Sequence, residues 1–337
     1  MTIDEQPDTA TTTLALRSRR WLRPQTLRNL VIDHAMVVVM LLIIAFFLYR
    51  SARFGTIENF STILIAAAPF ALIALGQTMV IITGGIDLSV GSVIAMAAMA
   101  SALTAKNNPD AMWLALVVAV GVGLAAGLVN GFVVARLNVP PFIATLGMLT
   151  LGSGIAYVIG GGAPINGLPN NFGTFANTEF LGIKIPVLLM IAGLVALGII
   201  MKRTAFGLRV YAVGGNRLAA EIAGVKADRI LLSVYVISGG LAGLSGLMLA
   251  SRVISGAPNL GSGYELDAIA AVVIGGASLM GGRGTIWGTA LGLLLIQTLN
   301  NGLDLLVVPA YWQDVITGAL IVAAVAIDLA TSKYRKR

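Results

Sequence analysis

The sequence predicts an all-α protein embedded in a lipid bilayer, which its helices cross about ten times. Of the 337 residues, 57% are hydrophobic and only 11% are charged, whereas soluble domains carry roughly 25% charged residues. Apolar stretches recur along the chain, many close to the length of about 20 residues that a bilayer-crossing helix needs. So few charges cannot cover a water-facing surface, and most of the chain is therefore expected in contact with membrane lipid.

Ten apolar stretches are candidate membrane spans. The eighth is short, which predicts that it is tilted, broken or partly re-entrant, because irregular backbone is tolerated at membrane depth where other protein covers it. In chain order the ten are Val31–Leu48, Ser61–Ile82, Leu88–Ala105, Ala111–Ala135, Val139–Gly160, Ile185–Met201, Ile230–Ser251, Ala268–Gly282, Gly284–Leu303 and Leu305–Ile327.

Positively charged residues indicate how these spans are oriented. If the N-terminus is inside, 17 of the 22 Lys and Arg residues fall in inner segments and five in outer ones, as the positive-inside rule requires. The predicted organisation is a cytoplasmic tail over residues 1–28, a transmembrane domain over 29–330 with a cytoplasmic loop at 202–229, and a basic cytoplasmic C-terminus at 331–337. The net charge of +7 thus follows from topology and does not predict nucleic-acid binding.

A weak internal repeat relates the two halves of the chain. Asn130-Gly131 is followed by a Val-Pro pair and Gly147, and Asn301-Gly302 is followed by another Val-Pro pair and Gly318. In the predicted topology the first copy lies at the inner end of a span and the second at the outer end, as in the inverted repeats of transporters. Chance is an equally good explanation, because Asn-Gly and Val-Pro are common turn signals.

The inner loop at 202–229 has the pattern of a short capped helix. Gly214-Gly215 predicts a turn, Asn216 is a suitable N-cap, and Leu218–Ala223 can form a helix that Gly224 ends. Leu218 and Ile222 share one face of that helix, because they are four residues apart. Such a helix could bind a cytoplasmic partner, although a solvated connector is the alternative.

Uncharged polar residues within the spans are the candidates for a transport pathway. Groups of this kind suit a neutral, hydroxylated substrate, but each could equally make a hydrogen bond between helices. The six candidates are Gln77, Asn130, Thr145, Gln297, Asn300 and Asn301.

Several kinds of catalytic and metal site are excluded or unsupported. The chain contains no Cys, which excludes thiolate catalysis and Cys-ligated metals. It has no phosphate-binding loop of the G-x-x-x-x-G-K-[ST] type. The only His, His34, is isolated from any candidate nucleophile, so we expect no enzyme activity, no metal site and no cofactor in this chain. Energy for transport would come from another subunit or from an ion gradient.

Several segments, taken in order, give the chain a resemblance to a known family. They are Gly85-Ile86-Asp87-Leu88-Ser89-Val90-Gly91, Asn130-Gly131, Pro140-Pro141-Phe142-Ile143-Ala144-Thr145-Leu146-Gly147, Val213-Gly214-Gly215-Asn216 with Ala219-Ala220 and Gly224, Glu265-Leu266-Asp267 with the apolar run to Gly275-Gly276, and Gly281-Gly282 with Gly284. On these motifs the chain resembles the ribose-type permease family of ABC importers.

The resemblance implies a multi-pass protein of the bacterial cytoplasmic membrane that transports a monosaccharide or related polyol. It implies three protein partners: a second permease chain, identical or different; a cytoplasmic ATPase that binds ATP and Mg²⁺; and an extracytoplasmic sugar-binding protein. It also makes the capped segment a coupling helix for the ATPase. The coupling residues it implies are Gly214, Gly215, Asn216, Ala219, Ala220, Glu221 and Gly224.

Two outer segments, residues 161–184 and 252–267, are candidates for docking the binding protein. Arg252, Glu265 and Asp267 supply scarce charges on this side, and exposed charges set the register and on-rate of transient interfaces. Two alternatives to a sugar importer stay open: an ion-coupled secondary transporter, and an ABC permease for branched-chain amino acids or nucleosides.

Overall fold

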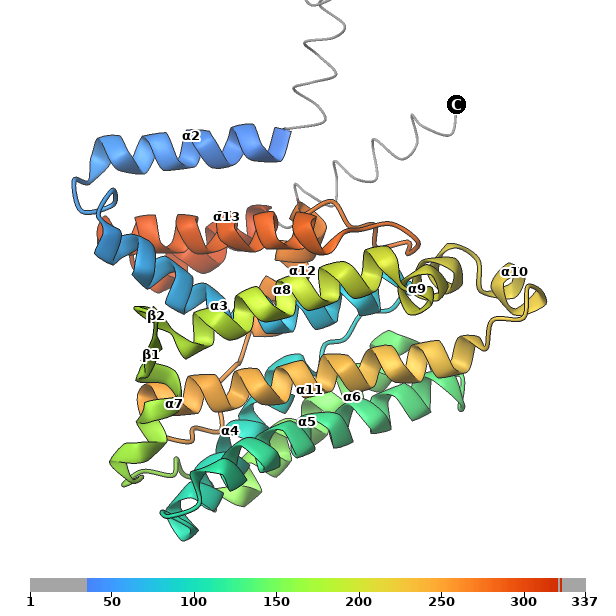
Figure 1. Cartoon of the computed structure of the whole chain (residues 1–337), viewed down its shortest axis with the longest axis horizontal. Helices are drawn as coiled ribbons and strands as arrows, with labels where there is room; N and C mark the ends of the chain where they lie inside the picture. Colours follow the sequence, from blue (N-terminus) through green and yellow to red (C-terminus); the bar gives the residue numbers. More distant parts are fainter. Residues whose placement is uncertain (1–34, 321, 323–337) are drawn as a thin grey trace, which may run out of the picture.

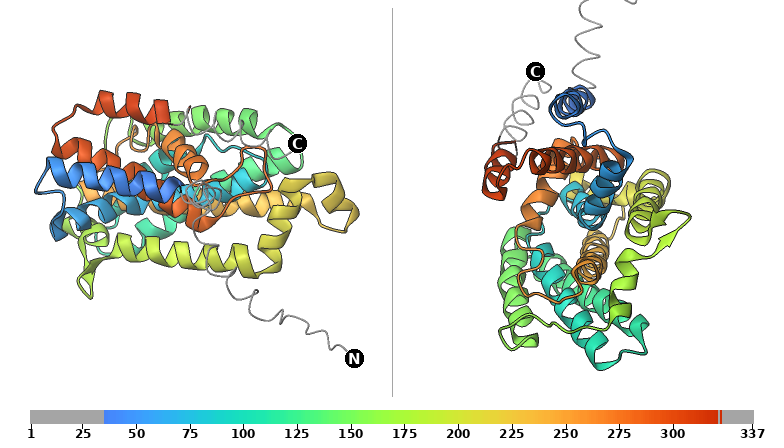
Figure 2. Two further views of the ribbon diagram at one scale, coloured as in Figure 1. Left: turned by 90° about the horizontal axis from the view of Figure 1, so that it is seen from above. Right: turned by 90° about the vertical axis from the view of Figure 1, so that its left-hand side faces the viewer.

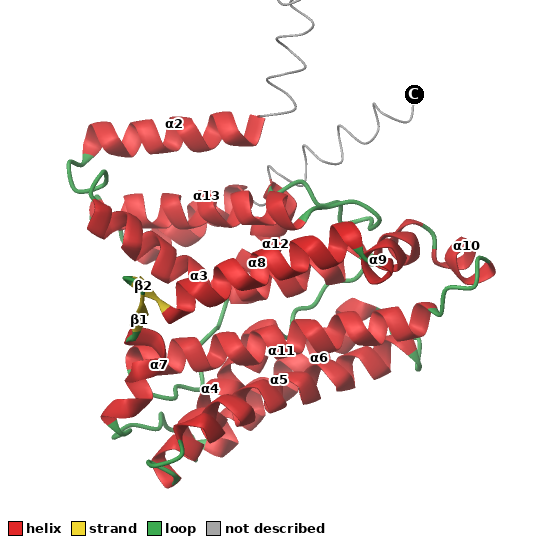
Figure 3. Cartoon of the chain, in the orientation of Figure 1, coloured by secondary structure: helices red, strands yellow, loops and turns green. Residues whose placement is uncertain are grey.

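The computed structural model describes residues 35–320 and 322, and most of these are helical (Figures 1 and 3). The two terminal segments predicted to be cytoplasmic therefore lie outside the described residues. The helices are α2 (Ala35–Arg50), α3 (Ile57–Ile82), α4 (Val90–Asn107), α5 (Met112–Ala135), α6 (Pro141–Ile159), α7 (Thr174–Asn177), α8 (Ile185–Arg203), α9 (Ala205–Gly215), α10 (Arg217–Ile222), α11 (Ala227–Val253), α12 (Tyr264–Ile274), α13 (Ile286–Leu305) and a last helical stretch over 310–320. A 3₁₀ turn at Asn170–Gly173 and a short antiparallel hairpin, β1 (Glu179–Phe180) with β2 (Ile183–Lys184), complete the described elements.

The long helices lie roughly along one direction, which gives the bundle two ends. One end carries α9 and α10, and the other carries α7 and the hairpin (Figure 1). We call these the α10 end and the hairpin end. Seen along the helices, α2 lies at the edge of the bundle beyond α13 (Figure 2). Five described helices, α3, α5, α6, α8 and α11, are long and apolar enough to cross a bilayer, which confirms a multi-pass all-α membrane protein.

Helices α5 and α11 cross at very close range because glycines face each other. A Cβ atom at Gly239 would overlap the carbonyl oxygen of Gly123, and one at Gly127 would overlap the carbonyl oxygen of Tyr235. Small residues permit such backbone contact between membrane helices, where van der Waals packing and not water drives association.

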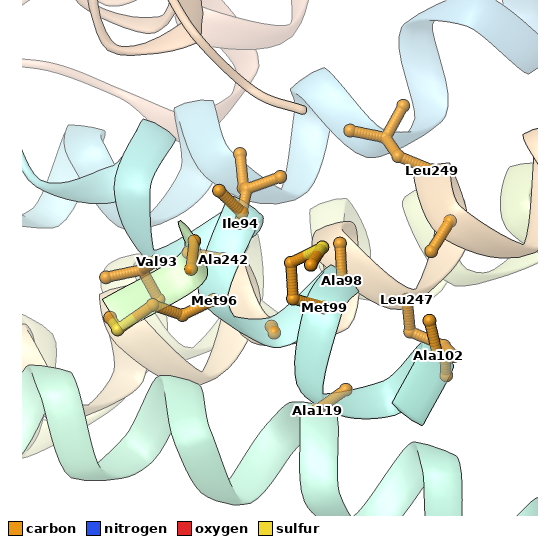
Figure 4. Packing of buried hydrophobic residues seen from close by; sticks show 14 of the residues in the cluster. Val93, Ile94, Met96, Ala98, Met99, Ala102, Ala119, Ala242, Leu247 and Leu249 are labelled. Carbon is orange, nitrogen blue, oxygen red and sulfur yellow. The ribbon is translucent and has the colours of Figure 1, made fainter. Parts of the chain in front are cut away.

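The largest buried cluster lies where α4 packs against α5 and α11. Ile94 and Met99 fill the space, while Ala98, Ala119 and Ala242 keep the helices close (Figure 4). This packing holds α4 inside the bundle, although α4 is preceded by irregular backbone.

Two segments that connect consecutive helices are irregular. Residues 83–89 between α3 and α4 contain no helix, and neither do residues 254–263 between α11 and α12. The eighth expected span, Ala268–Gly282, is helical only as part of α12, whose 11 residues cover about 16 Å of a hydrocarbon core of about 30 Å. Of the alternatives that the sequence left open for this span, the structure thus supports a broken segment.

The two halves contain the same series of elements in opposite directions. Helices α3 and α11 have 26 and 27 residues, and each leads through an irregular segment to a second, shorter helix. Helix α3 ends at the α10 end of the bundle, where Gly214 packs against Ile82, whereas α11 ends at the hairpin end, where Ser251 bonds to residues 172 and 176. Asn130 and Asn301 lie near the ends of corresponding helices, α5 and α13. The arrangement is that of the predicted inverted repeat.

Candidate functional site

Three of the six predicted pathway residues converge on the irregular segment before α4. Gln77 on α3 pairs with Asp87: in the amide orientation that satisfies both groups, it donates to the Asp87 carbonyl oxygen and accepts from the Asp87 N–H, each at 3.2 Å. The Oγ1 atom of Thr145 on α6 donates to the carbonyl oxygen of Ile86 at 3.1 Å. These bonds satisfy backbone groups that have no helical partner, which irregular backbone at membrane depth requires.

The third residue, Asn130 on α5, acts on the same segment. Its Nδ2 atom donates to Ser89 Oγ at 2.8 Å. Ser89 in turn donates from its N–H and its Oγ to Asp87 Oδ1, at 2.9 and 2.6 Å, and Ser238 on α11 lies 3.5 Å from Asp87 Oδ2. Asp87 therefore forms a turn with Ser89. Helix α4 begins only at Val90, two residues after the predicted start of this span at Leu88.

These polar groups position the segment and leave no open surface for a solute. Gln77 and Thr145 have 0% of their surface exposed, and Asn130 has 2%. Their observed contacts are structural hydrogen bonds from helices to the irregular segment, and a direct substrate contact by any of the three stays a prediction.

The other three predicted pathway residues lie on α13. Asn301 exchanges two hydrogen bonds with Asn59 on α3, both at 2.9 Å. Gln297 is buried, and the Oδ1 atom of Asn300 is buried with no hydrogen-bond partner among the described residues. The structure does not bring these three together with Gln77, Asn130 and Thr145 in a single site.

A polar cavity lies between α4, α6 and the segment that leads into α12. Its volume is about 180 Å³. The side chains that line it offer hydroxyls, an amide and a carboxylate together with apolar surface. The lining residues are Gly91, Ser92, Ala95, Leu149, Ser153, Tyr157, Pro258, Asn259, Leu260, Ser262 and Glu265.

Glu265 and Asp267 lie deeper than the outer rim where the sequence placed them. Both belong to the first turn of α12, and the adjacent Tyr264 stacks on Phe70, halfway along α3, with ring centroids 4.1 Å apart. Glu265 packs so closely on α4 that a Cβ atom at Gly91 would overlap its Oε2 atom. The structure thus places both residues within the bundle, because residues 254–263 enter it, and a docking role for them stays a prediction.

Arg252 is the member of the predicted docking set that does lie at the hairpin end. It is exposed in the last turn of α11. With Thr62, Asn177 and Lys184 it lines a shallow pocket of about 190 Å³. Its docking role stays a prediction.

The capped segment has the predicted helix at its centre. Asn216 accepts a hydrogen bond from the Ala219 N–H at 3.0 Å and caps α10, and Gly224 ends the turn with φ at +85°, where a residue with a Cβ is strained. Ala220 is buried against the bundle, while Ala219 and Glu221 are exposed.

Ion pairs fix α10 to the bundle. Arg217 pairs with Glu221 at 2.9 Å and with Asp228 at 2.8 Å, and Asp228 also lies 3.8 Å from Arg136 at the end of α5. Leu218 and Ile222 stay 68% and 81% exposed. The ion pairs thus hold α10 against the bundle, while its two apolar side chains remain exposed.

Gly214-Gly215 does not form the predicted turn, because both residues belong to the last turn of α9. The reason is a tertiary contact. A Cβ atom at Gly214 would overlap the carbonyl oxygen of Ile82, whereas one at Gly215 would meet no atom within 4 Å. Gly214 is small so that α9 can lie directly on the end of α3.

Comparison with known proteins decides the family. The family model described as "Branched-chain amino acid transport system / permease component" matches residues 59–325. The chain belongs to this permease family. It is 44% identical over 272 residues to the ribose import permease protein RbsC of Bacillus subtilis (strain 168), covering 80% of this chain and 84% of the relative. Over 296 residues it is 40% identical to RbsC of Escherichia coli (strain K12), covering 87% and 92%.

A third relative is named for another sugar. The galactose/methyl galactoside import permease protein MglC of Haemophilus influenzae is 37% identical over 327 residues, which cover 92% of this chain and 97% of the relative. No solved structure matches the permease significantly.

Sequence reasoning missed the serines of this permease. Ser89 and Ser238 bond to Asp87, and Ser92 and Ser153 line the cavity. Serines in apolar stretches often bond to the preceding turn of their own helix. The one local signal was the position of Ser89, which directly precedes the start of α4 at Val90-Gly91.

Proposed function

We propose that this permease is the membrane subunit of an ABC importer that takes up a monosaccharide or related polyol across the bacterial cytoplasmic membrane. The observation that carries the proposal is similarity over most of the chain to permeases named for ribose and for galactose. The family itself takes its description from branched-chain amino acid transport. A cavity with hydroxyl, amide and carboxylate groups at membrane depth favours a hydroxylated solute over an aliphatic one, because buried polar groups need polar partners.

The α10 end is assigned to the cytoplasm and the hairpin end to the outside. Among the described residues, eight Lys and Arg lie at the α10 end and five at the hairpin end, which supports this orientation by the positive-inside rule. Both termini would then be cytoplasmic.

Energy enters through a separate ATPase that binds ATP and Mg²⁺. Leu218 and Ile222 on α10 supply exposed apolar surface for that partner, and the Arg217–Asp228 pair keeps the helix from rotating freely. Two apolar side chains on a single α10 would make only a weak contact. A second permease chain, identical or different, would offer the ATPase a second α10.

A row of close backbone contacts connects α9, which directly precedes α10, to the irregular segment. Gly214 lies on Ile82, and Gly282 donates from its N–H to the Ile82 carbonyl oxygen at 2.8 Å. A Cβ atom at Gly281 would meet Gly84 at 3.0 Å. Residues 85–89 follow directly, so a displacement of α9 by the ATPase would act on the backbone that Gln77, Asn130 and Thr145 hold.

An ion-coupled secondary transporter is the alternative from another class. It would need an ionisable group that changes its charge within the transport cycle. The most deeply buried carboxylate among the described residues, Asp87, accepts two hydrogen bonds from Ser89, which favours a structural role for it.

Growth on a single sugar tests the proposal. A bacterial strain without its own ribose and galactose importers would receive the permease alone, or with a cognate ATPase and sugar-binding protein. Growth restored on either sugar by the three components together, and lost when the ATPase is omitted, supports an ABC importer. Growth with the permease alone contradicts it.

A further inference from the structure

The structure assigns a substrate-hydroxyl subsite to the cavity between α4, α6 and α12, with Glu265 as its acceptor. This inference rests on the proposed function and names the atoms that would bind the sugar. The cavity lies about halfway along the neighbouring helices. Ser92 Oγ bonds to the carbonyl oxygen of Met148, halfway along α6, at 3.3 Å, and Tyr264 stacks on Phe70 halfway along α3.

The second step is the carboxylate itself. Glu265 Oε2 is buried and has no hydrogen-bond partner among the described residues, and the side chain lines the cavity. Leaving such an acceptor unpaired is unfavourable, and more so when the group is charged. The start of α4 lies directly beside it at Gly91, and the positive end of a helix dipole stabilises a nearby carboxylate. The charge is thus tolerated at this depth, and Oε2 stays without a donor among the described residues.

The third step is the composition around the carboxylate. Ser92, Ser153, Asn259 and Ser262 bring donors and acceptors to the same cavity from three segments of the chain. A polar surface of this kind at membrane depth does not face lipid, so it lines a water-filled space or meets another protein surface. A carboxylate that accepts from two hydroxyls, with serine and amide groups around it, is suited to a neutral polyhydroxylated ring.

The size of the cavity limits the ligand. Pockets that enclose drug-sized ligands measure about 300–1,000 Å³, whereas this one measures about 180 Å³. It therefore fits one small ring or part of one, and the remaining contacts would come from the second permease chain across the pathway.

Cysteine labelling tests the subsite, because the natural chain has no Cys. Ser153→Cys would place a unique thiol in the cavity, and Leu151→Cys would place one on the exposed, apolar side of the same helix as a matched control. Both variants would be assembled with the ATPase and binding protein in lipid vesicles and treated with a small, charged thiol reagent. We expect the thiol at position 153 to react at least about tenfold faster, since it lies in a wet cavity, and ribose at millimolar concentration to slow that reaction.

The double variant Glu265→Gln/Ser153→Cys tests whether Glu265 accepts the hydrogen bonds of the sugar hydroxyls. Because a hydrogen bond to a charged group contributes about 1.5–3 kcal/mol, protection by ribose should require at least about tenfold more sugar. Glu58→Gln, on the exposed first turn of α3, should leave protection unchanged.

Three outcomes overturn the assignment: equal labelling at positions 151 and 153, no protection by ribose or galactose, or equal protection with and without the Glu265 substitution. The labelling experiments are carried out with a complex whose unsubstituted form takes up ribose or galactose. If the unsubstituted complex takes up neither sugar, the proposed function fails, and that failure is distinct from failure of the subsite.

Discussion

Replacing Ile222 by Ser should weaken ATPase binding strongly while leaving the permease itself intact. Ile222 is 81% exposed on α10, so nearly all of its apolar surface is available to a partner. Burying an Ile side chain completely contributes about 1.5–3 kcal/mol. Losing that contribution weakens association by about tenfold to a hundredfold, whereas a substitution at an exposed position changes folding stability by only about 0.5 kcal/mol.

The assay is a titration of the permease in lipid nanodiscs with purified ATPase, read out as a dissociation constant. Val158→Ser is the matched control, because Val158 is 80% exposed but lies near the C-terminal end of α6, away from α10. Val158→Ser should bind the ATPase like the unsubstituted permease. The reasoning is refuted if Ile222→Ser also binds normally while its thermal unfolding is unchanged.

Three further predictions follow from the geometry. Gly214→Ala should destabilise the permease by about 1–3 kcal/mol, because its Cβ atom would overlap the Ile82 carbonyl oxygen. A Cβ atom at Gly215 would meet no atom within 4 Å, so Gly215→Ala should melt at the temperature of the unsubstituted permease. Equal melting temperatures for the two variants would contradict the close contact. Arg252→Glu should raise the concentration of binding protein at half-maximal uptake, since exposed charges set the on-rate, and excess binding protein should restore the rate; an unaltered concentration dependence would remove Arg252 from the docking surface. A Cys at position 179 in the exposed hairpin should react with an impermeant thiol reagent in intact cells and one at position 222 should not, and the reverse pattern would overturn the orientation.

Local signals in the sequence were sufficient for the parts of the fold that depend on local physics. Hydropathy predicted the long helices, because a bilayer demands apolar length. The helix α10 was predicted from Asn216, which caps it, and Gly224, which ends it. Both features act within one turn of the helix and need no contact from elsewhere in the chain.

Contacts between distant residues account for what the sequence did not predict. Residues 254–263 are rich in Gly, Ser and Asn and have the composition of an outer loop, but Gly261 packs on Ile94 and brings Glu265 to Gly91. Gly214-Gly215 has the composition of a turn, and the contact with Ile82 makes it the end of a helix. Neither partner can be identified from spacing along the chain.

The predicted pathway residues illustrate the same limit. Polar residues in apolar spans were correctly singled out as unusual, but residue type does not distinguish a group that holds backbone from one that faces a solute. Gln77 and Thr145 hold residues 86 and 87. The cavity, by contrast, is lined by serines that no sequence pattern singled out.

Sugar uptake by the purified components tests the central claim most directly. The permease and its ATPase would be placed in lipid vesicles with ATP and Mg²⁺ inside, and the binding protein and radiolabelled ribose or galactose outside. We predict that sugar accumulates only when ATP, ATPase and binding protein are all present. Accumulation driven by a sodium or proton gradient in the absence of ATP would contradict the assignment of this permease to an ABC importer.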